Sequence, residues 1–241
     1  TLSDTPIAEQ IICAVDLGIN TDAVCSIMKA DGTILARKFI DFTSDKDRMI
    51  HAMNRTRRKQ SKYGPKSTRG LWAYVKRLNE DRAKKISAAI VEFASQHSVD
   101  AIVMEHLDFK GCKKRGSKAQ RLSMWNHGII REKVEQKAHL LGIRIATICA
   151  WKTSALAFDG SGSVTRDDNN HALATFTTGK QYNCDLSASY NIGARYFIRE
   201  LLKSLPATEE SRVKAKVPDA GRRTSCTLST LRALVKELSA A

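Results

Sequence analysis

The sequence predicts an α/β domain with a mixed five-stranded sheet, helices on both faces and an irregular insert before the last helix. The first observation is that short apolar runs alternate with long stretches of helical periodicity. The second is their order, which is three strands, helices, a strand, a helix, a strand and a helix. The third is a hairpin signal at Asp31-Gly32, which makes the early strands antiparallel, whereas the later strands are separated by helices and should run parallel.

The first strand is the apolar run 11–16, which ends in Asp16 and is followed by Gly18 and Asn20. The second strand is expected over 22–29 and the third over 33–40, because both are rich in β-branched and small apolar residues. A carboxylate at the end of a buried strand is costly unless it is paired or holds a metal ion. Asp16 is therefore a candidate functional residue.

A strongly basic helical insert follows over residues 44–97, interrupted once at 62–65 by a Gly-Pro pair. Between residues 46 and 85 there are 14 Lys and Arg residues against three acidic ones. A one-signed cluster of this density repels itself without a counter-anion, so we expect it to contact phosphates. The residues that carry this prediction are Arg55, Arg57, Arg58, Lys59 and Lys62.

The fourth strand is expected over residues 100–107 and again ends near a carboxylate, Glu105. A basic, glycine-containing loop without acidic residues follows over 109–120, and its place beside the carboxylates predicts contacts with backbone phosphates. The loop residues expected to make them are Lys113, Lys114, Arg115 and Lys118. A helix over 121–142 and a fifth strand over 143–148 complete the sheet.

Residues 151–182 form an insert rich in turn residues, which we expect to be irregular. The last core helix is predicted over 183–205, with Asp185 near its start. One domain therefore covers residues 11–205, and residues 1–10 are expected to be a linker or a cut end. Residues 206–241 are expected to hold a polar linker, up to residue 223, and a short C-terminal helix.

This order of elements is that of the ribonuclease H-like fold, in which the first and fourth strands lie side by side. Asp16 and Glu105 would then be neighbours at the carboxyl ends of their strands, and Asp185 can face the same edge. Three converging carboxylates repel one another unless cations lie between them. Mg²⁺, or Mn²⁺ in its place, suits such oxygen ligands, and a pair of these ions can activate water for phosphodiester cleavage.

Three segments resemble the RuvC motifs of TnpB nucleases, which are transposon-associated, RNA-guided DNA endonucleases related to type V CRISPR effectors. They are residues 15–20 (VDLGIN), 102–107 (IVMEHL) and 185–192 (DLSASYNI). The resemblance extends over residues 11–204 and implies a metal-dependent endonuclease acting with DNA and a guide RNA. It also implies that Asp16, Glu105 and Asp185 are the catalytic, metal-binding acids.

Two further residues are expected to support this site. Asn191 lies six residues after Asp185 on the same helix, and Arg166 in the turn-rich insert is a candidate contact for the scissile phosphate.

Two departures from the family pattern change what the resemblance implies. TnpB-like chains carry a four-cysteine zinc ribbon between the second and third motifs. Here the same region offers only Cys149, His171 and Cys184, so we expect a degenerate zinc-ribbon-like insert without zinc. The family's guide-binding N-terminal half does not precede the first motif, so we expect a separate chain or a missing N-terminal lobe to supply guide and target recognition.

Composition narrows the class of partner. The chain has 241 residues, a net charge of +15 and an isoelectric point near 9.7. This balance indicates nucleic acid before membrane, and no apolar run reaches the roughly 20 residues that span a bilayer. The six cysteines form no C-x-x-C pair, which is typical of reduced thiols. Together with the family resemblance, this predicts a cytoplasmic, prokaryotic, nucleoid-associated protein.

Three alternatives stay open. A TnpB relative can bind DNA under RNA guidance without cleaving it, although such relatives lose one of the acids and this chain keeps three. A guide-free resolvase or integrase of the RuvC type would use the same fold as a dimer. An actin-like sugar kinase also begins with Asp-Leu-Gly and an Asp-Gly hairpin, but it needs a second subdomain and a glycine-rich phosphate loop that this sequence lacks.

Overall fold

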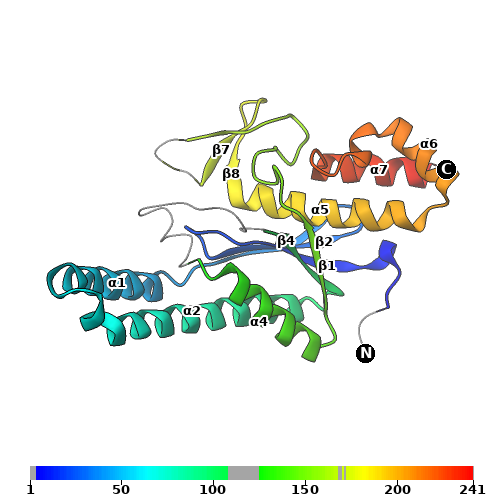
Figure 1. Ribbon diagram of the computed structural model, residues 1–241. Helices are drawn as coiled ribbons and strands as arrows, with labels where there is room; N and C mark the ends of the chain where they lie inside the picture. Colours follow the sequence, from blue (N-terminus) through cyan, green and yellow to red (C-terminus); the bar gives the residue numbers. More distant parts are fainter. Residues whose placement is uncertain (1–3, 108–124, 168–169, 171, 241) are drawn as a thin grey trace.

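The computed structural model describes residues 4–107, 125–167, 170 and 172–240. At its centre is a mixed five-stranded sheet in the order β3-β2-β1-β4-β5, seen edge-on in Figure 1. β1 pairs antiparallel with β2 and parallel with β4, so the first and fourth strands are neighbours as predicted. The strands are β1 (Ile11–Asp16), β2 (Ala23–Lys29), β3 (Ile34–Ile40), β4 (Ala101–His106) and β5 (Arg144–Cys149).

Helices cover both faces of this sheet, and each face has its own apolar core. One core lies between the sheet and α5 (Cys184–Ser204), and the other lies between the sheet and the pair α2 (Arg69–Gln96) and α4 (His127–Leu140). Figure 1 shows α5 on one side of the sheet and α2 and α4 on the other. The predicted α/β class and the ribonuclease H-like order of elements are confirmed.

α5 lies directly against the sheet because Gly193 has no side chain. A Cβ built at this position would come within 2.9 Å of Met28 on β2 and 3.2 Å of Ala14 on β1. Both neighbours are fully buried, so neither has room to move away. Gly193 therefore sets how closely the start of α5 approaches the end of β1.

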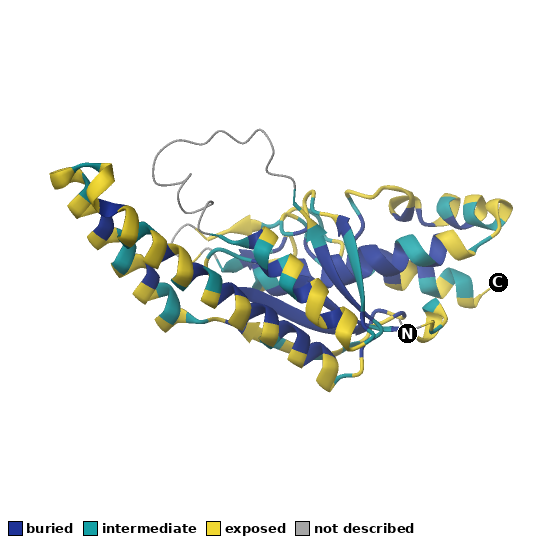
Figure 2. Ribbon diagram, turned by 60° about the horizontal axis from the view of Figure 1, so that its bottom comes forward, coloured by how far each residue is buried: buried dark blue, intermediate teal, exposed yellow. Residues whose placement is uncertain are grey.

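A long helical hairpin follows the third strand. It consists of α1 (Thr43–Tyr63), a 3₁₀ turn η2 (Pro65–Thr68) and α2, and the predicted break at 62–65 is confirmed. Gly64 joins the two helices with a φ of 79°, in the left-handed region that glycine adopts freely. Figure 2 shows the hairpin projecting beyond the sheet, with most of α1 exposed.

A buried ion pair joins this hairpin to the sheet. The Arg82 guanidinium on α2 donates to the carboxylate of Asp22, which is itself almost fully buried just before β2. The other oxygen of Asp22 accepts a 2.9 Å hydrogen bond from the main-chain N–H of Phe42. Because breaking a buried pair leaves an uncompensated charge, this contact strongly favours one placement of α2.

Two predicted elements differ in extent from what the structure shows. The helix expected over 121–142 is not helical at residues 125–126 and begins at His127; residues 121–124 lie outside the described ranges. The insert 151–182 holds more structure than predicted: β6 (Thr165–Arg166), β7 (Leu173–Thr175) and β8 (Gln181–Asn183) form a small antiparallel sheet. Runs of two or three residues carry no readable periodicity, so turn chemistry dominated the prediction.

The prediction of a polar linker over residues 206–223 is wrong. α6 (Ala207–Lys216) and the 3₁₀ turn η3 (Pro218–Gly221) occupy it, and α7 (Leu228–Ser239) follows as the expected C-terminal helix. The few apolar side chains of the linker segment, Val213, Val217 and Ala220, are buried in the α5-side core. These apolar residues are too few among charged neighbours to indicate a helix from the sequence.

The segment before β1 is also tied to the domain, against the expectation of a plain linker. A 3₁₀ turn η1 (Ile7–Glu9) precedes Gln10, whose side-chain oxygen accepts a 2.9 Å hydrogen bond from the buried hydroxyl of Tyr196. None of the helices in the described ranges combines the length and the apolar character needed to cross a bilayer.

Candidate active site

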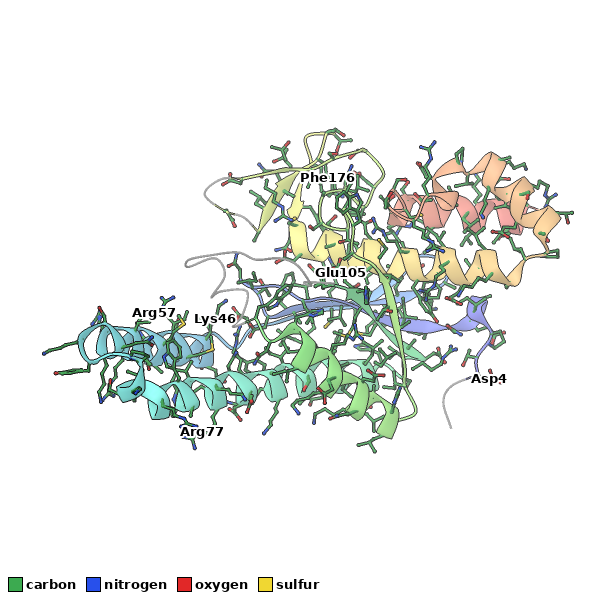
Figure 3. All side chains as sticks on the ribbon, viewed as in Figure 1. Asp4, Lys46, Arg57, Arg77, Glu105 and Phe176 are labelled. Carbon is green, nitrogen blue, oxygen red and sulfur yellow. The ribbon has the colours of Figure 1, made fainter. Side chains whose placement is uncertain are left out.

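Asp16 and Glu105 lie on the same face of the sheet because side chains alternate along strands. Ile12 and Ala14 belong to the α5-side core, so Asp16, two residues further along β1, lies on that face too. Val103 belongs to the same core, so Glu105, two residues further along β4, also lies on that face. The strands pair in parallel up to the residues just before the two acids, which puts the carboxylates side by side. Figure 3 shows Glu105 between the sheet and α5.

Asp185 joins them from the first turn of α5, facing the end of β1. Burial raises the pKa of Asp16 well above its ordinary value, and the negative charges of Glu105 and Asp185 raise it further. Burial also raises the pKa of Glu105 and of Asp185. Carboxylates affect one another in this way only when they are close and poorly hydrated. The structure thus brings the three predicted acids together at one edge of the sheet.

Arg166 provides a counter-charge to this cluster. It lies on β6 in the insert, and its positive charge lowers the pKa of both Asp16 and Asp185 against the effect of burial. The side chain of Thr21 also hydrogen-bonds to Asp185 and acts in the same direction. Arg166 was expected to contact a scissile phosphate; it lies beside the carboxylates, where such a phosphate would have to come.

Thr153 hydrogen-bonds to Glu105. Its hydroxyl donates a hydrogen bond to Glu105, which lowers the pKa of that carboxyl against the effect of burial. Thr153 is held in turn by Asn191, whose side-chain N–H group donates to the Thr153 carbonyl at 3.0 Å. Asn191 is fully buried and contacts main-chain groups only, so it is a positioning residue rather than a group that faces the substrate.

Arg195 is a further site residue that sequence reasoning missed. It lies one helical turn after Asn191, is buried, and its positive charge lowers the pKa of Glu105. Its guanidinium donates to four main-chain carbonyls, those of Cys149 and Trp151 at 2.8 Å, Thr224 at 3.0 Å and Cys226 at 3.2 Å. The available signal was an arginine inside the apolar run 192–198 of α5 (IGARYFI), where a charged side chain must be paired to be buried.

The donor set suits a hard divalent cation such as Mg²⁺, because it consists of carboxylate oxygens whose mutual repulsion such a cation would relieve. In the described ranges, however, no three His, Cys, Asp or Glu side chains are arranged as a finished metal site. The three acids therefore fit a divalent cation by their chemistry, although in the described residues they are not close enough to one another to count as a group of three metal ligands. Neither Cys149, which is exposed, nor the buried Cys184 belongs to such a group either.

The predicted nucleic-acid contacts fall into two groups. The hairpin residues lie on the exposed part of α1, and Figure 3 shows Arg57 there, well away from Glu105; this group comprises Arg55, Arg57, Arg58, Lys59 and Lys62. The loop residues Lys113, Lys114, Arg115 and Lys118 lie outside the described residues. The two groups therefore cannot be treated as one surface.

No family model matches the sequence, and no curated protein matches it significantly. Solved structures do resemble it. A chain of the Cas12f1–sgRNA–target DNA complex superposes with a TM-score of 0.57 at 19% identity, covering 79% of this chain and 51% of that one. A chain of the AacC2c1–sgRNA binary complex has a TM-score of 0.57 at 10% sequence identity, covering 78% of this chain and 39% of that one. A chain of a CRISPR-Cas12f ternary complex has a TM-score of 0.54 at 17% identity, covering 79% of this chain and 40% of that one.

This chain thus spans about half or less of the chains it resembles. At such low identities the likeness concerns the fold alone: this chain shares its fold with part of each of these Cas12f1, Cas12f and AacC2c1 chains. It assigns no role to any single residue.

Proposed function

We propose that this chain is the nuclease lobe of an RNA-guided DNA endonuclease and that Asp16, Glu105 and Asp185 hold the divalent cations for phosphodiester hydrolysis. The observation that carries the proposal is the convergence of three partly buried carboxylates, from β1, β4 and α5, whose ionisation is unfavourable at their present spacing. Buried carboxylates that raise one another's pKa are typical of functional sites.

Each residue has a distinct part in this proposal. Asp16, Glu105 and Asp185 would bind the cation, Mg²⁺ or Mn²⁺, which when bound supplies activation of water and stabilisation of the leaving oxygen. Thr153 orients the Glu105 carboxylate through its hydroxyl. Arg166 balances the negative charge of Asp16 and Asp185 and lies where it can attract the phosphate of the substrate.

The partners follow from charge and from the structural neighbours. A net charge of +15 favours a polyanionic partner, and two of the similar structures are complexes with sgRNA, one of them also with target DNA. We therefore assign DNA as the substrate and a guide RNA as the specificity element, with cleavage taking place in the cytoplasm. Recognition of guide and target belongs to parts of the assembly beyond the lobe described here.

The test is cleavage of labelled single-stranded and duplex DNA with Mg²⁺, with and without candidate guide RNA. Asp16→Asn, Glu105→Gln and Asp185→Asn should each abolish cleavage, and the double variants should be no worse than the single ones because one cation site is lost in every case. Gln136→Ala, an exposed change on α4, is the control. Parental cleavage by Asp185→Asn would remove that residue from the mechanism.

A second function, guided DNA binding without cleavage, is favoured by one observation. In the described residues the three acids do not form a group that could hold a metal ion, and Arg166 already supplies positive charge to Asp16 and Asp185. A pure binding module would show no Mg²⁺-dependent cleavage, and the three neutralised variants would bind DNA as the parent does.

A further inference from the structure

A groove runs along the free edge of β5 on the α5 side of the sheet. Its volume is about 950 Å³, and its walls come from β5, α5, α6, η3 and the loop after β5. Six basic side chains line it against a single acidic one, Glu210. The basic residues are Lys152, Arg195, Arg199, Lys203, Lys214 and Arg223. Three of them are already paired, Arg199 and Lys203 with Glu200 and Lys214 with Glu210, and the positive charge that remains in excess favours a polyanionic occupant.

The exposed edge of β5 is already capped by two arginines. An edge strand normally offers its main-chain groups to another strand, so a peptide would be the obvious occupant. Here Arg199 donates to the carbonyl of Thr147 at 2.7 Å, and Arg195 donates to that of Cys149 at 2.8 Å. These contacts occupy acceptors that an added strand would need and replace them with positive charge. The edge therefore favours phosphate over peptide.

An exposed aromatic ring stands at the mouth of the groove. Trp151 is 64% exposed, which is unusual for so large an apolar side chain. Lys152 follows it with a φ of 59°, a left-handed conformation that is unfavourable for a residue with a Cβ. The turn is held by Arg195, which donates to the Trp151 carbonyl at 2.8 Å, and by the Ala155 N–H, which donates to Lys152 at 3.2 Å. The main chain that carries this exposed indole is thus fixed by two hydrogen bonds.

One end of the groove lies near the candidate active site, although none of the three acids lines it. His106 and Cys149 both line it and are paired at the ends of β4 and β5, and His106 directly follows Glu105. Thr153, which holds Glu105, comes two residues after Trp151. Arg195, which lines the groove, also acts on Glu105 through its charge, so a strand lying in the groove would pass near that carboxylate.

We infer that the groove binds single-stranded nucleic acid, with a base stacked on Trp151 and backbone phosphates on Lys152, Lys203 and Arg223. Unpaired bases stack on exposed aromatic rings without regard to sequence, and basic side chains beside the ring follow the backbone. The inference deepens the proposed nuclease function, since it gives the path of one DNA strand near Glu105.

The test measures binding of a labelled oligothymidine to the full chain in EDTA, so that no cleavage interferes. Trp151→Ala should weaken binding about tenfold, and Trp151→Tyr, which keeps a stacking ring, should stay near the parent. Lys203→Glu should weaken binding and reduce its salt dependence. Lys137→Glu, an equally drastic change on exposed α4 across the sheet, is the matched control and should have little effect. With 5-bromodeoxyuridine in the strand, ultraviolet crosslinks should map to the peptide that contains Trp151.

Equal affinities of Trp151→Ala and the parent, or crosslinks that avoid the Trp151 peptide, would overturn the inference. So would polyglutamate binding that depends on Trp151 while oligothymidine binding does not, because this points to a protein partner. Cleavage with Mg²⁺ is scored separately. If Trp151→Ala loses binding but the parent never cleaves, the groove inference stands and the nuclease proposal is wrong. If Asp16→Asn loses cleavage but Trp151→Ala binds as the parent does, the nuclease proposal stands and the groove inference is wrong.

Discussion

The side-chain amide of Asn191 donates a 3.0 Å hydrogen bond to the main-chain carbonyl of Thr153, the residue whose hydroxyl holds Glu105. The same amide donates to the Leu156 carbonyl at 2.9 Å, and its oxygen accepts from the N–H of Leu228 at 3.3 Å. One buried side chain on α5 therefore positions the start of the insert and the start of α7. The position of Glu105 therefore depends on this contact as well as on the sheet.

Asn191→Ala should lower the free energy of unfolding by about 2–4 kcal/mol, because three buried main-chain groups lose their partner. Urea denaturation measures this, with Gln136→Ala on exposed α4 expected to stay within about 0.5 kcal/mol of the parent. A loss as small as that of the control would show that water or a shifted loop satisfies these groups, and the positioning role would be wrong.

Thr153→Val should move the acid limb of the cleavage profile to higher pH. The hydroxyl lowers the pKa of Glu105, and valine keeps the shape of the side chain but removes the donor. The pKa of Glu105 then rises, so a higher pH is needed to ionise it. Thr153→Ser keeps the hydroxyl and should retain the parental limb. Rates measured across pH 5–9 separate the two, and an unshifted limb in Thr153→Val would mean that ionisation of Glu105 does not limit cleavage.

The metal-free protein should become less stable as pH rises towards neutrality. Burial and the neighbouring carboxylates raise the pKa of Asp16 well above its ordinary 3.8, so the folded state holds this proton more tightly than the unfolded chain does. That stabilisation is complete below pH 3.8 and is lost as pH rises through the raised value. Asp16→Asn should therefore be more stable than the parent at pH 7.5 in EDTA, and this difference in stability should be smaller at pH 5.

Thermal unfolding at the two pH values checks this. Adding Mg²⁺ at pH 7.5 should stabilise the parent and leave Asp16→Asn nearly unchanged, because a ligand stabilises only the fold that binds it. Parallel pH profiles for parent and variant would show that Asp16 carries no such strain.

Much of the fold was predictable because its signals are local. The apolar runs of β1, β2 and β4, the Gly64 break and the helical periodicity of α2 and α5 each lie within a few residues of sequence. The order of elements also placed Asp16 and Glu105 together, because it made the first and fourth strands neighbours. What escaped prediction depends on contacts between distant residues. Arg195 joins α5 to carbonyls of residues 149, 151, 224 and 226, and no pattern within its own helix reveals those partners.

The insert and the C-terminal segment escaped for a related reason. Phe158, Phe176 and Tyr182 form one aromatic cluster, in which Phe158 makes T-shaped contacts with the other two rings at centroid distances of 5.5 and 4.9 Å. Trp151, in the same insert, lies exposed at the β5 edge instead. Sequence composition identifies apolar rings, but only the fold decides which of them meet.

Arg195→Lys should lower the free energy of unfolding by about 2–4 kcal/mol while leaving the acid limb of cleavage close to the parent. Lysine keeps the positive charge near Glu105, but its compact ammonium group cannot reach four carbonyls as the planar guanidinium does. Arg195→Met should lose stability as well and also shift the acid limb upward, since the pKa of Glu105 rises without the charge. Equal limbs in the two variants would rule out the electrostatic role and leave only the structural one.

Replacing Arg57, Arg58 and Lys59 together with Gln should weaken nucleic-acid binding and flatten its dependence on salt. These residues are exposed on the projecting hairpin, and among the described residues no carboxylate forms an ion pair with any of the three. Each phosphate that they neutralise releases counterions, so the slope of log affinity against log salt should fall by about 0.7–0.9 per lost contact. Sequence preference should not change, because phosphate contacts carry none. The matched control removes the same charge elsewhere, by changing Lys29, Lys133 and Lys137 to Gln. Identical slopes for the two triple variants would mean that the hairpin is an ordinary solvated face and that its charge serves solubility alone.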